Sequence, residues 1–205
     1  VQADPDQEWW QAPFHLDGRL AAWLSGDDTP DRALAGSFTL TAPDTPLFPA
    51  SFTNPLTAHT AAMLKSSPGF AVVAISGSSG SGRQHFARHT ARLLGKELLT
   101  VPFHAVGEAG LLRPRPWRQV LRELLLTGRL LCLSNLECPP EQRPARLPAL
   151  LRQLEQSLSP FGAPVFFTAD ASVKVIPFLT CPVFPAAIPH PTISQSAQLW
   201  RELSG

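Results

Sequence analysis

The sequence has few cysteines, no long apolar run and little net charge. Its three cysteines, Cys132, Cys138 and Cys181, are an odd set without metal-ligand spacing, which argues against a disulfide framework and predicts free thiols in a reducing compartment. No apolar run is long enough to span a membrane, and no secretory signal precedes the first acidic residues, so a cytoplasmic location away from membranes is expected. The 205 residues, 44% of them hydrophobic, are enough for one sizeable core with an appended segment.

The net charge of +1 hides an uneven distribution along the chain. Residues 1–60 contain eight acidic and two basic side chains, whereas residues 61–155 contain thirteen basic and six acidic ones. The basic part could bind nucleic acid, and the contacts would then be Arg113, Arg115, Arg118 and Arg122. We favour docking on the acidic part, of this chain or of a neighbouring subunit, because the arginines are scattered and have no interleaved aromatic residues.

The first 50 residues are expected to form an aromatic and acidic arm followed by short helices. Trp9, Trp10 and Phe14 predict that residues 1–15 lay aromatic side chains on a surface, most simply that of their own domain. The order of side chains then indicates a short helix from Asp17 to Leu24 and a second one starting at Thr29-Pro30-Asp31. Residues 38–48 are predicted to be a connector, and the whole segment is too small for a core of its own.

Residues 51–205 are predicted to form an α/β domain. Apolar runs indicate strands at 70–75, 97–103, 130–133 and 164–168, with a fifth at 173–178 or 183–188. Helices are expected at 54–67, 85–94 and 117–126, before residue 158, and at 195–203. Alternation of this kind predicts a parallel sheet of about five strands with helices on both faces, and a ligand site at the carboxyl ends of the strands.

A glycine-rich loop joins the first of these strands to the helix that follows it. The loop consists of Gly77, Ser78, Ser79, Gly80, Ser81, Gly82, Arg83 and Gln84. Strand, glycine-rich turn and helix form the layout of a P-loop, in which backbone N–H groups and the helix dipole bind phosphate. A flexible connector is the plainer alternative, but its place between a strand and a helix argues against it. Phe86, Leu93 and Leu94 of the helix are expected to face the sheet.

The chemistry of this loop is incomplete. The spacing of Gly77 and Gly82 fits the P-loop, but Arg83 and Gln84 stand where the motif has lysine and then serine or threonine. Arginine is not interchangeable with lysine, and a glutamine side chain is a poor substitute for a hydroxyl on Mg²⁺. We therefore expect either no nucleotide or weakly bound ATP or ADP.

The order of glycine-loop strand, arginine-rich helix, third strand, long helix and fourth strand resembles an AAA-type ATPase. The opening WWQAPFHLDGRLAAWLSGDDTPDRALAG is similar to the leader that precedes the ATPase core in one bacterial group, which is associated with gene clusters for contractile injection systems. Some members of that group carry two nucleotide domains, the first of them degenerate. The resemblance thus implies that this chain is part of a longer protein.

The resemblance also implies catalytic residues that this chain lacks. An acidic pair should end the third strand, yet Ser134 and Asn135 occupy those positions, and Glu137 comes two residues late. Thr168 corresponds to the polar sensor of the fourth strand, with Asp170 as its neighbour. No arginine follows Arg152 before Arg201, so an arginine finger is missing, and the C-terminal lid is expected to be absent.

These losses predict a catalytically inactive module that acts by packing, within a longer chain, in a ring of subunits or on a partner protein. A missing general base costs about 10²–10⁴ in rate, and a missing arginine finger about 10³–10⁵. The first alternative is an atypical nucleotide-binding or hydrolysing enzyme that places Arg83 on phosphate and borrows Glu137 or Asp170. The second alternative is a nucleic-acid-binding module.

Overall fold

The computed structural model describes residues 16–31, 38–43, 54–67, 69–136, 141, 143–170, 175–190, 192–195, 197 and 201. Several predictions from the sequence lie outside these residues. They are the aromatic arm at 1–15, the body of the second short helix at 32–37, the position of Glu137 and most of the last helix.

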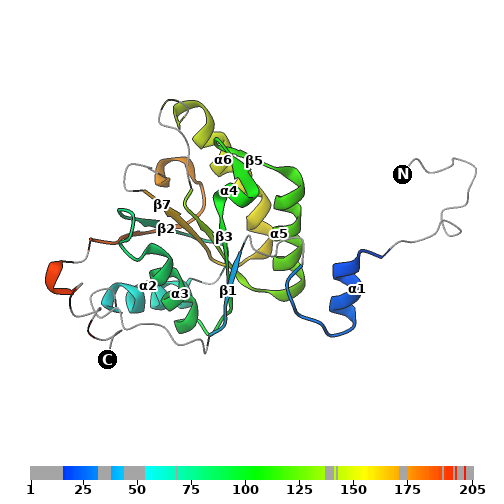
Figure 1. The fold of residues 1–205 in the computed structure, drawn as a ribbon. Helices are drawn as coiled ribbons and strands as arrows, with labels where there is room; N and C mark the ends of the chain where they lie inside the picture. Colours follow the sequence, from blue (N-terminus) through cyan, green and yellow to red (C-terminus); the bar gives the residue numbers. More distant parts are fainter. Residues whose placement is uncertain are drawn as a thin grey trace, which may run out of the picture.

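The centre of the fold is a six-stranded, mainly parallel sheet (Figure 1). Its strands, in spatial order, are β1 (Thr39–Thr41), β3 (Leu98–Pro102), β6 (Leu130–Ser134), β7 (Val165–Ala169), β2 (Val72–Ser76) and β8 (Val183–Ala187). The five strands from β3 to β8 are parallel, as predicted, and the fifth in sequence is the one at 183–187.

The edge strand β1 corrects the prediction of a connector at 38–48. Thr39 lies opposite Thr100 of β3, and the two strands run antiparallel. Threonine fits a pleated, half-buried surface, and Thr41 is buried against the sheet. This strand therefore forms because it pairs with the edge of β3, and not because the segment contains a long apolar run.

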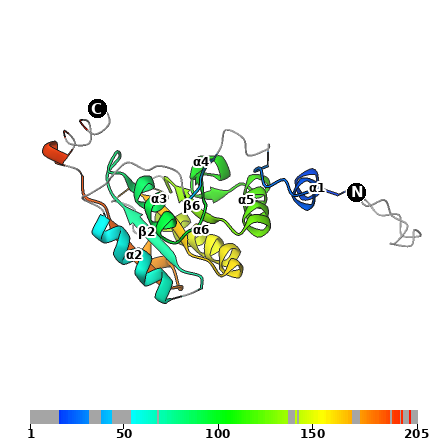
Figure 2. The same cartoon turned by 90° about the horizontal axis from the view of Figure 1, so that it is seen from below.

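Helices cover both faces of the sheet (Figure 2). One face packs on α2 (Asn54–Ser66) and α3 (Arg83–Leu93), and the other on α5 (Pro114–Thr127) and α6 (Arg143–Leu158). Smaller elements are α4 (Phe103–Val106), the hairpin of β4 (Gly107–Glu108) and β5 (Leu111–Leu112), η4 (Ser159–Phe161) and η5 (Ile176–Phe178). Among the described residues, no helix has the length and apolarity that crossing a membrane requires.

Alternate residues of each strand enter opposite cores. Val73 and Ile75 of β2 pack towards α2 and α3, whereas Val72 packs towards α5 and α6. In α3, Phe86 is fully buried as predicted, but Leu93 is 45% exposed. The buried positions of this helix are taken by smaller residues, including Ala87 and Ala91, which allow α3 to approach the sheet closely.

The connections between strands place the glycine-rich loop, which follows β2, beside the point where the strand order reverses. The crossover from β2 to β3 passes through α3 on one face, and the crossovers back to β6 and β7 pass through α5 and α6 on the other. Right-handed crossovers require this change of face when the direction of strand addition reverses. The reversal lies beside β2, and such a switch point is where open α/β sheets bind ligands.

The leader helix α1 (Gly18–Leu24) lies beyond α5, at the end of the molecule away from α2 and α3 (Figures 1 and 2). Asp17 caps it, as predicted, by accepting hydrogen bonds from the N–H groups of Arg19 and Leu20. Residues 29–31 are not helical.

Cys132 and Cys181 are free thiols, and burial raises the pKa of Cys132 to about 12.

Candidate functional site

The glycine-rich loop leaves the carboxyl end of β2 and enters α3 directly. The Ser81 N–H donates to the Ser78 carbonyl at 3.2 Å, which closes a turn. Gly82 is the N-cap of α3 with a φ of 89°, a left-handed conformation that favours glycine. Its carbonyl accepts the Phe86 N–H at 2.9 Å and so starts the helical hydrogen bonds. The first helical N–H groups of α3 consequently open towards the loop.

The interior of the loop is tightly packed around Gly77. A Cβ at this position would lie 2.5 Å from Ser81 Oγ and 2.8 Å from the Ile188 carbonyl oxygen. Ser81 points into the loop, is 1% exposed, and its hydroxyl has no hydrogen-bond partner among the described residues. A buried hydroxyl without a partner is uncommon and marks a place where a bound polar group would be favoured.

Arg83 and Gln84 are the first two residues of α3, and both are half-buried. A positive charge in the first turn of a helix interacts unfavourably with the helix dipole. The ion pairs of the described residues do not include Arg83. An anion bound at the loop would interact favourably with both the helix dipole and the Arg83 charge. Ser78, Ser79 and Gly80 of the loop are exposed to solvent.

The structure brings Ser134, Asn135 and Thr168 together at the ends of β6 and β7. Ser134 faces the α3 side of the sheet with 1% exposure, and its hydroxyl has no partner among the described residues. Asn135 has a φ of 54°, and its N–H donates to Thr168 Oγ1 at 2.9 Å. The Leu136 N–H donates to the Thr168 carbonyl at 2.8 Å. Thr168 therefore fixes the backbone that follows β6.

The arrangement offers hydroxyl and amide groups but no carboxylate at the two positions where metal-assisted hydrolysis needs one. Asp170 follows β7 and is exposed. Arg88 of α3, which the sequence predicts to be solvated, is instead half-buried, and its Nε is buried without a partner among the described residues. The site can donate hydrogen bonds to an oxyanion, but Ser134 and Asn135 cannot supply a general base.

A hollow of about 270 Å³ lies on the face of the sheet opposite α3. Its lining includes Ala74, Phe167, Ala169, Val175, Pro185 and Ala187. The short crossover through η5, in place of a long helix, leaves this part of β2, β7 and β8 less covered. With no charged residue in its lining, the hollow cannot replace the missing catalytic groups.

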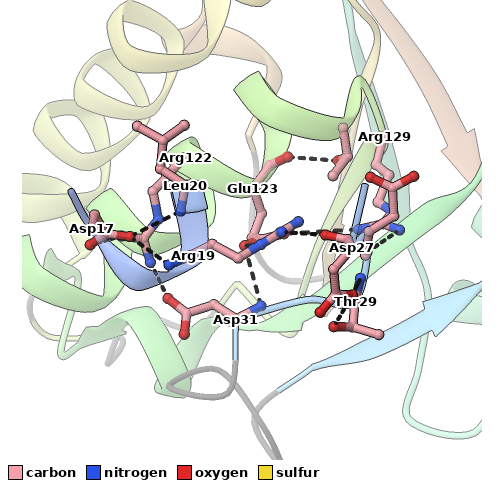
Figure 3. Close-up of polar contacts among 11 residues, drawn as sticks. Asp17, Arg19, Leu20, Asp27, Thr29, Asp31, Arg122, Glu123 and Arg129 are labelled. Atoms are coloured by element: carbon pink, nitrogen blue, oxygen red, sulfur yellow. Dashed lines mark hydrogen bonds and ion pairs between the residues drawn. The ribbon is translucent and has the colours of Figure 1, made fainter. Parts of the chain in front are cut away.

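Two of the four arginines proposed for nucleic acid already make contacts within the chain. Arg113 donates to the His104 and Ala105 carbonyls at 2.7 and 2.5 Å. Arg122 binds Asp17 at 2.6 Å and also pairs with Asp31 (Figure 3). Arg113, Arg115 and Arg118 are exposed and form none of the ion pairs found among the described residues, but Arg113 is held by its two carbonyl acceptors.

The same contacts join the acidic leader to the basic part of its own chain. Arg19 Nε lies 2.6 Å from Glu123 Oε1 and Arg19 Nη2 lies 3.1 Å from Glu123 Oε2, with side-chain exposures of 4% and 0% (Figure 3). The Asp31 N–H donates to the same carboxylate at 3.2 Å. Arg129 pairs with Glu97 at 2.6 Å nearby. We call the contacts of Arg19, Asp17 and Asp31 with Arg122 and Glu123 the leader clasp.

The sequence predicted docking of the basic part on the acidic part, but it did not predict the residues of the leader clasp, although one signal for them was available. Glu123 falls between Val120 and Leu124 on the buried face of α5, where an acidic residue needs a partner. Arg19 is one of only two basic residues in the first 60.

No family model matches this chain, and neither does any curated protein. The chain is an α/β domain with a mainly parallel six-stranded sheet, and its function is inferred from the fold and the site alone.

Proposed function

We propose that this chain is a catalytically inactive AAA-type P-loop domain that serves as an assembly or protein-interaction module of a larger ATPase. One observation carries the proposal. The glycine-rich loop between β2 and α3 has the placement of a phosphate loop, while Ser134 and Asn135, at the end of β6 and two strands from β2, stand where the resemblance requires carboxylates.

The inactivity follows from the chemistry of these side chains. Hydrolysis of a nucleotide needs a group that orients or deprotonates water and oxygen ligands that hold Mg²⁺. Ser134 offers a buried hydroxyl, and the Asn135 backbone is held by Thr168. A general base alone contributes about 10²–10⁴ in rate, so its loss removes most of the activity.

Thr168 supports the AAA-type assignment. It lies on β7, the strand next to β2, and it hydrogen-bonds to the segment that follows β6. A polar residue at this place could sense a bound phosphate in an active relative. In this chain its measurable role is to position Asn135.

Phosphate release from ATP by the purified chain tests the proposal. The control variants are Arg83→Ala, in the first turn of α3, and Arg92→Ala, which is exposed in the last turn of the same helix. We expect no release above background with or without Mg²⁺ for any of the three proteins. Release that depends on Arg83 and not on Arg92 would overturn the inactive assignment.

Sedimentation over a range of protein concentrations tests the assembly role. We expect concentration-dependent association in the absence of nucleotide, because the proposed role is packing rather than catalysis. A chain that stays monomeric alone and also with the neighbouring domains of its own polypeptide would contradict this role.

Binding of ATP or ADP without hydrolysis is a second function that the loop favours. Ser81 and Ser134 are buried hydroxyls without partners among the described residues, and the half-buried Arg83 forms none of the ion pairs found among those residues. Titration calorimetry should then show binding that is independent of Mg²⁺, lost in Arg83→Ala and retained in Arg92→Ala. The structure offers less support for nucleic-acid binding, because Arg113 and Arg122 already bind within the chain.

A further inference from the structure

The solvent-exposed face of α5 combines positive charge with apolar side chains. Arg115, Arg118 and Leu125 are exposed, and Leu125 is 75% exposed. The opposite face of the helix is buried through Trp117, Val120 and Leu124, so the two faces separate at the helical period. Exposed arginines, with an exposed leucine two turns after Arg118 on the same face, suit a partner that is both acidic and aromatic.

This face continues an interface that the chain already makes. Arg122 lies one turn from Arg118, and it binds the Asp17 carboxylate of the leader clasp at 2.6 Å. The described residues begin at Leu16, next to Asp17. Whatever precedes Leu16 in the sequence therefore starts beside the exposed face of α5.

The preceding 15 residues have the matching chemistry. They contain Asp4, Asp6 and Glu8 and no lysine or arginine, and the acidic residues lead directly into Trp9 and Trp10. Carboxylates pair with arginine, and indole rings stack on guanidinium groups with about 0.5–1 kcal/mol at exposed sites.

The distances along the chain allow the contact. Trp10 precedes Asp17 by seven residues, which an extended chain spans with at most about 25 Å. Arg115 precedes Arg122 by the same number of residues, which corresponds to only about 10 Å along a helix. Both arginines are within reach of the aromatic pair from the point where Arg122 holds Asp17.

We propose that residues 1–15 dock on the exposed face of α5 of their own chain, with the carboxylates on Arg115 and Arg118 and the indoles over these guanidinium groups and Leu125. This docking extends the leader clasp along α5. It does not depend on the glycine-rich loop or on a nucleotide, so it is tested independently of the proposed function.

Collisional quenching of tryptophan fluorescence tests the docking in the full chain. The chain has five tryptophans, and a Trp9→Phe/Trp10→Phe variant gives the signal of the other three for subtraction. We expect the Trp9 and Trp10 signal to be shielded in the natural chain. In Arg115→Glu/Arg118→Glu it should become as accessible as in a free peptide of residues 1–15.

Two further variants make the test specific. Arg92→Glu/Arg152→Glu reverses two exposed arginines on α3 and α6 and should leave the shielding unchanged. Asp4→Lys/Asp6→Lys/Glu8→Lys, combined with the reversed α5, should restore the shielding. Circular dichroism confirms that each variant is folded.

Three results would overturn the proposal. The first is equal quenching in the natural chain and in Arg115→Glu/Arg118→Glu. The second is the same loss of shielding in the control reversal on α3 and α6. The third is shielding that disappears on dilution, which would place residues 1–15 on another copy of the chain.

Discussion

Arg19 and Glu123 are 104 residues apart in the sequence, yet they form a bidentate ion pair with almost no exposure to solvent. Arg19 comes from the leader helix α1 and Glu123 from the buried face of α5. The Asp31 N–H completes the coordination of the carboxylate. The leader is thereby part of the α/β domain in the folded chain, because separating them would take Arg19 and the Asp31 N–H away from a buried carboxylate that keeps only Arg129, at 3.9 Å.

Removing one member of this pair should destabilise the chain strongly. In Arg19→Met the Glu123 carboxylate remains buried without its bidentate partner and keeps only the longer contact with Arg129 at 3.9 Å, which costs about 3–5 kcal/mol of unfolding free energy. The double variant Arg19→Met/Glu123→Leu should lose less unfolding free energy than either single variant, because neither charge of the pair is left buried alone and Arg129 keeps its ion pair with Glu97. Urea unfolding measures all three, with Arg152→Met as an exposed control. Additive losses in the double variant would contradict the coupling.

Much of the fold could be predicted because each buried strand is a short apolar run between turns. The runs at 72–76, 98–102, 130–134 and 165–169 contain mainly residues that suit a sheet covered on both faces. β1 could not be predicted in this way. It is three residues long, and it forms because the edge of β3 offers it backbone partners.

The site shows the same division between local and tertiary information. The place of the loop between strand and helix follows from the sequence, because the glycine positions are local signals. The bond between Thr168 and Asn135 depends on the adjacency of β6 and β7, which the sequence does not specify. The exposure of Leu93 likewise follows from the register in which α3 meets the sheet.

Gly77→Ala should destabilise the chain through the close packing of the loop. The added methyl group would meet the Ile188 carbonyl oxygen at 2.8 Å, which is backbone and cannot rotate away. Overpacking of this kind costs about 1–3 kcal/mol. Gly18→Ala is the matched control, because its added Cβ meets no atom within 4 Å. Thermal or urea unfolding measures the stability of both variants. Equal stability would show that the loop accommodates the added methyl group without a loss of unfolding free energy.

Ser134 and Thr168 should respond in opposite ways to the loss of their hydroxyl groups. Ser134→Ala removes a buried hydroxyl without a partner among the described residues, so we expect unchanged or slightly increased stability. Thr168→Val leaves the Asn135 N–H without its acceptor, which costs about 1–3 kcal/mol. Urea unfolding distinguishes the two. If Ser134→Ala were as destabilising as Thr168→Val, the Ser134 hydroxyl would have a partner in solution, such as an ordered water.

Glu155 should make part of the stability depend on pH. Partial burial alone would raise the pKa of this carboxyl group, but hydrogen bonds from Thr180 and from the Cys181 N–H outweigh burial and lower the pKa below its ordinary value. A lowered pKa stabilises the fold above the ordinary carboxyl range, and this contribution is lost as the pH falls through the pKa of the folded state. Glu155→Gln should therefore lower the unfolding free energy by roughly 1 kcal/mol near neutral pH, after allowance for solvent screening, and by nearly nothing near pH 3. Glu108→Gln, at an exposed position, is the control. A loss for Glu155→Gln that stayed constant across this range would mean that the loop contacts do not depend on the charge.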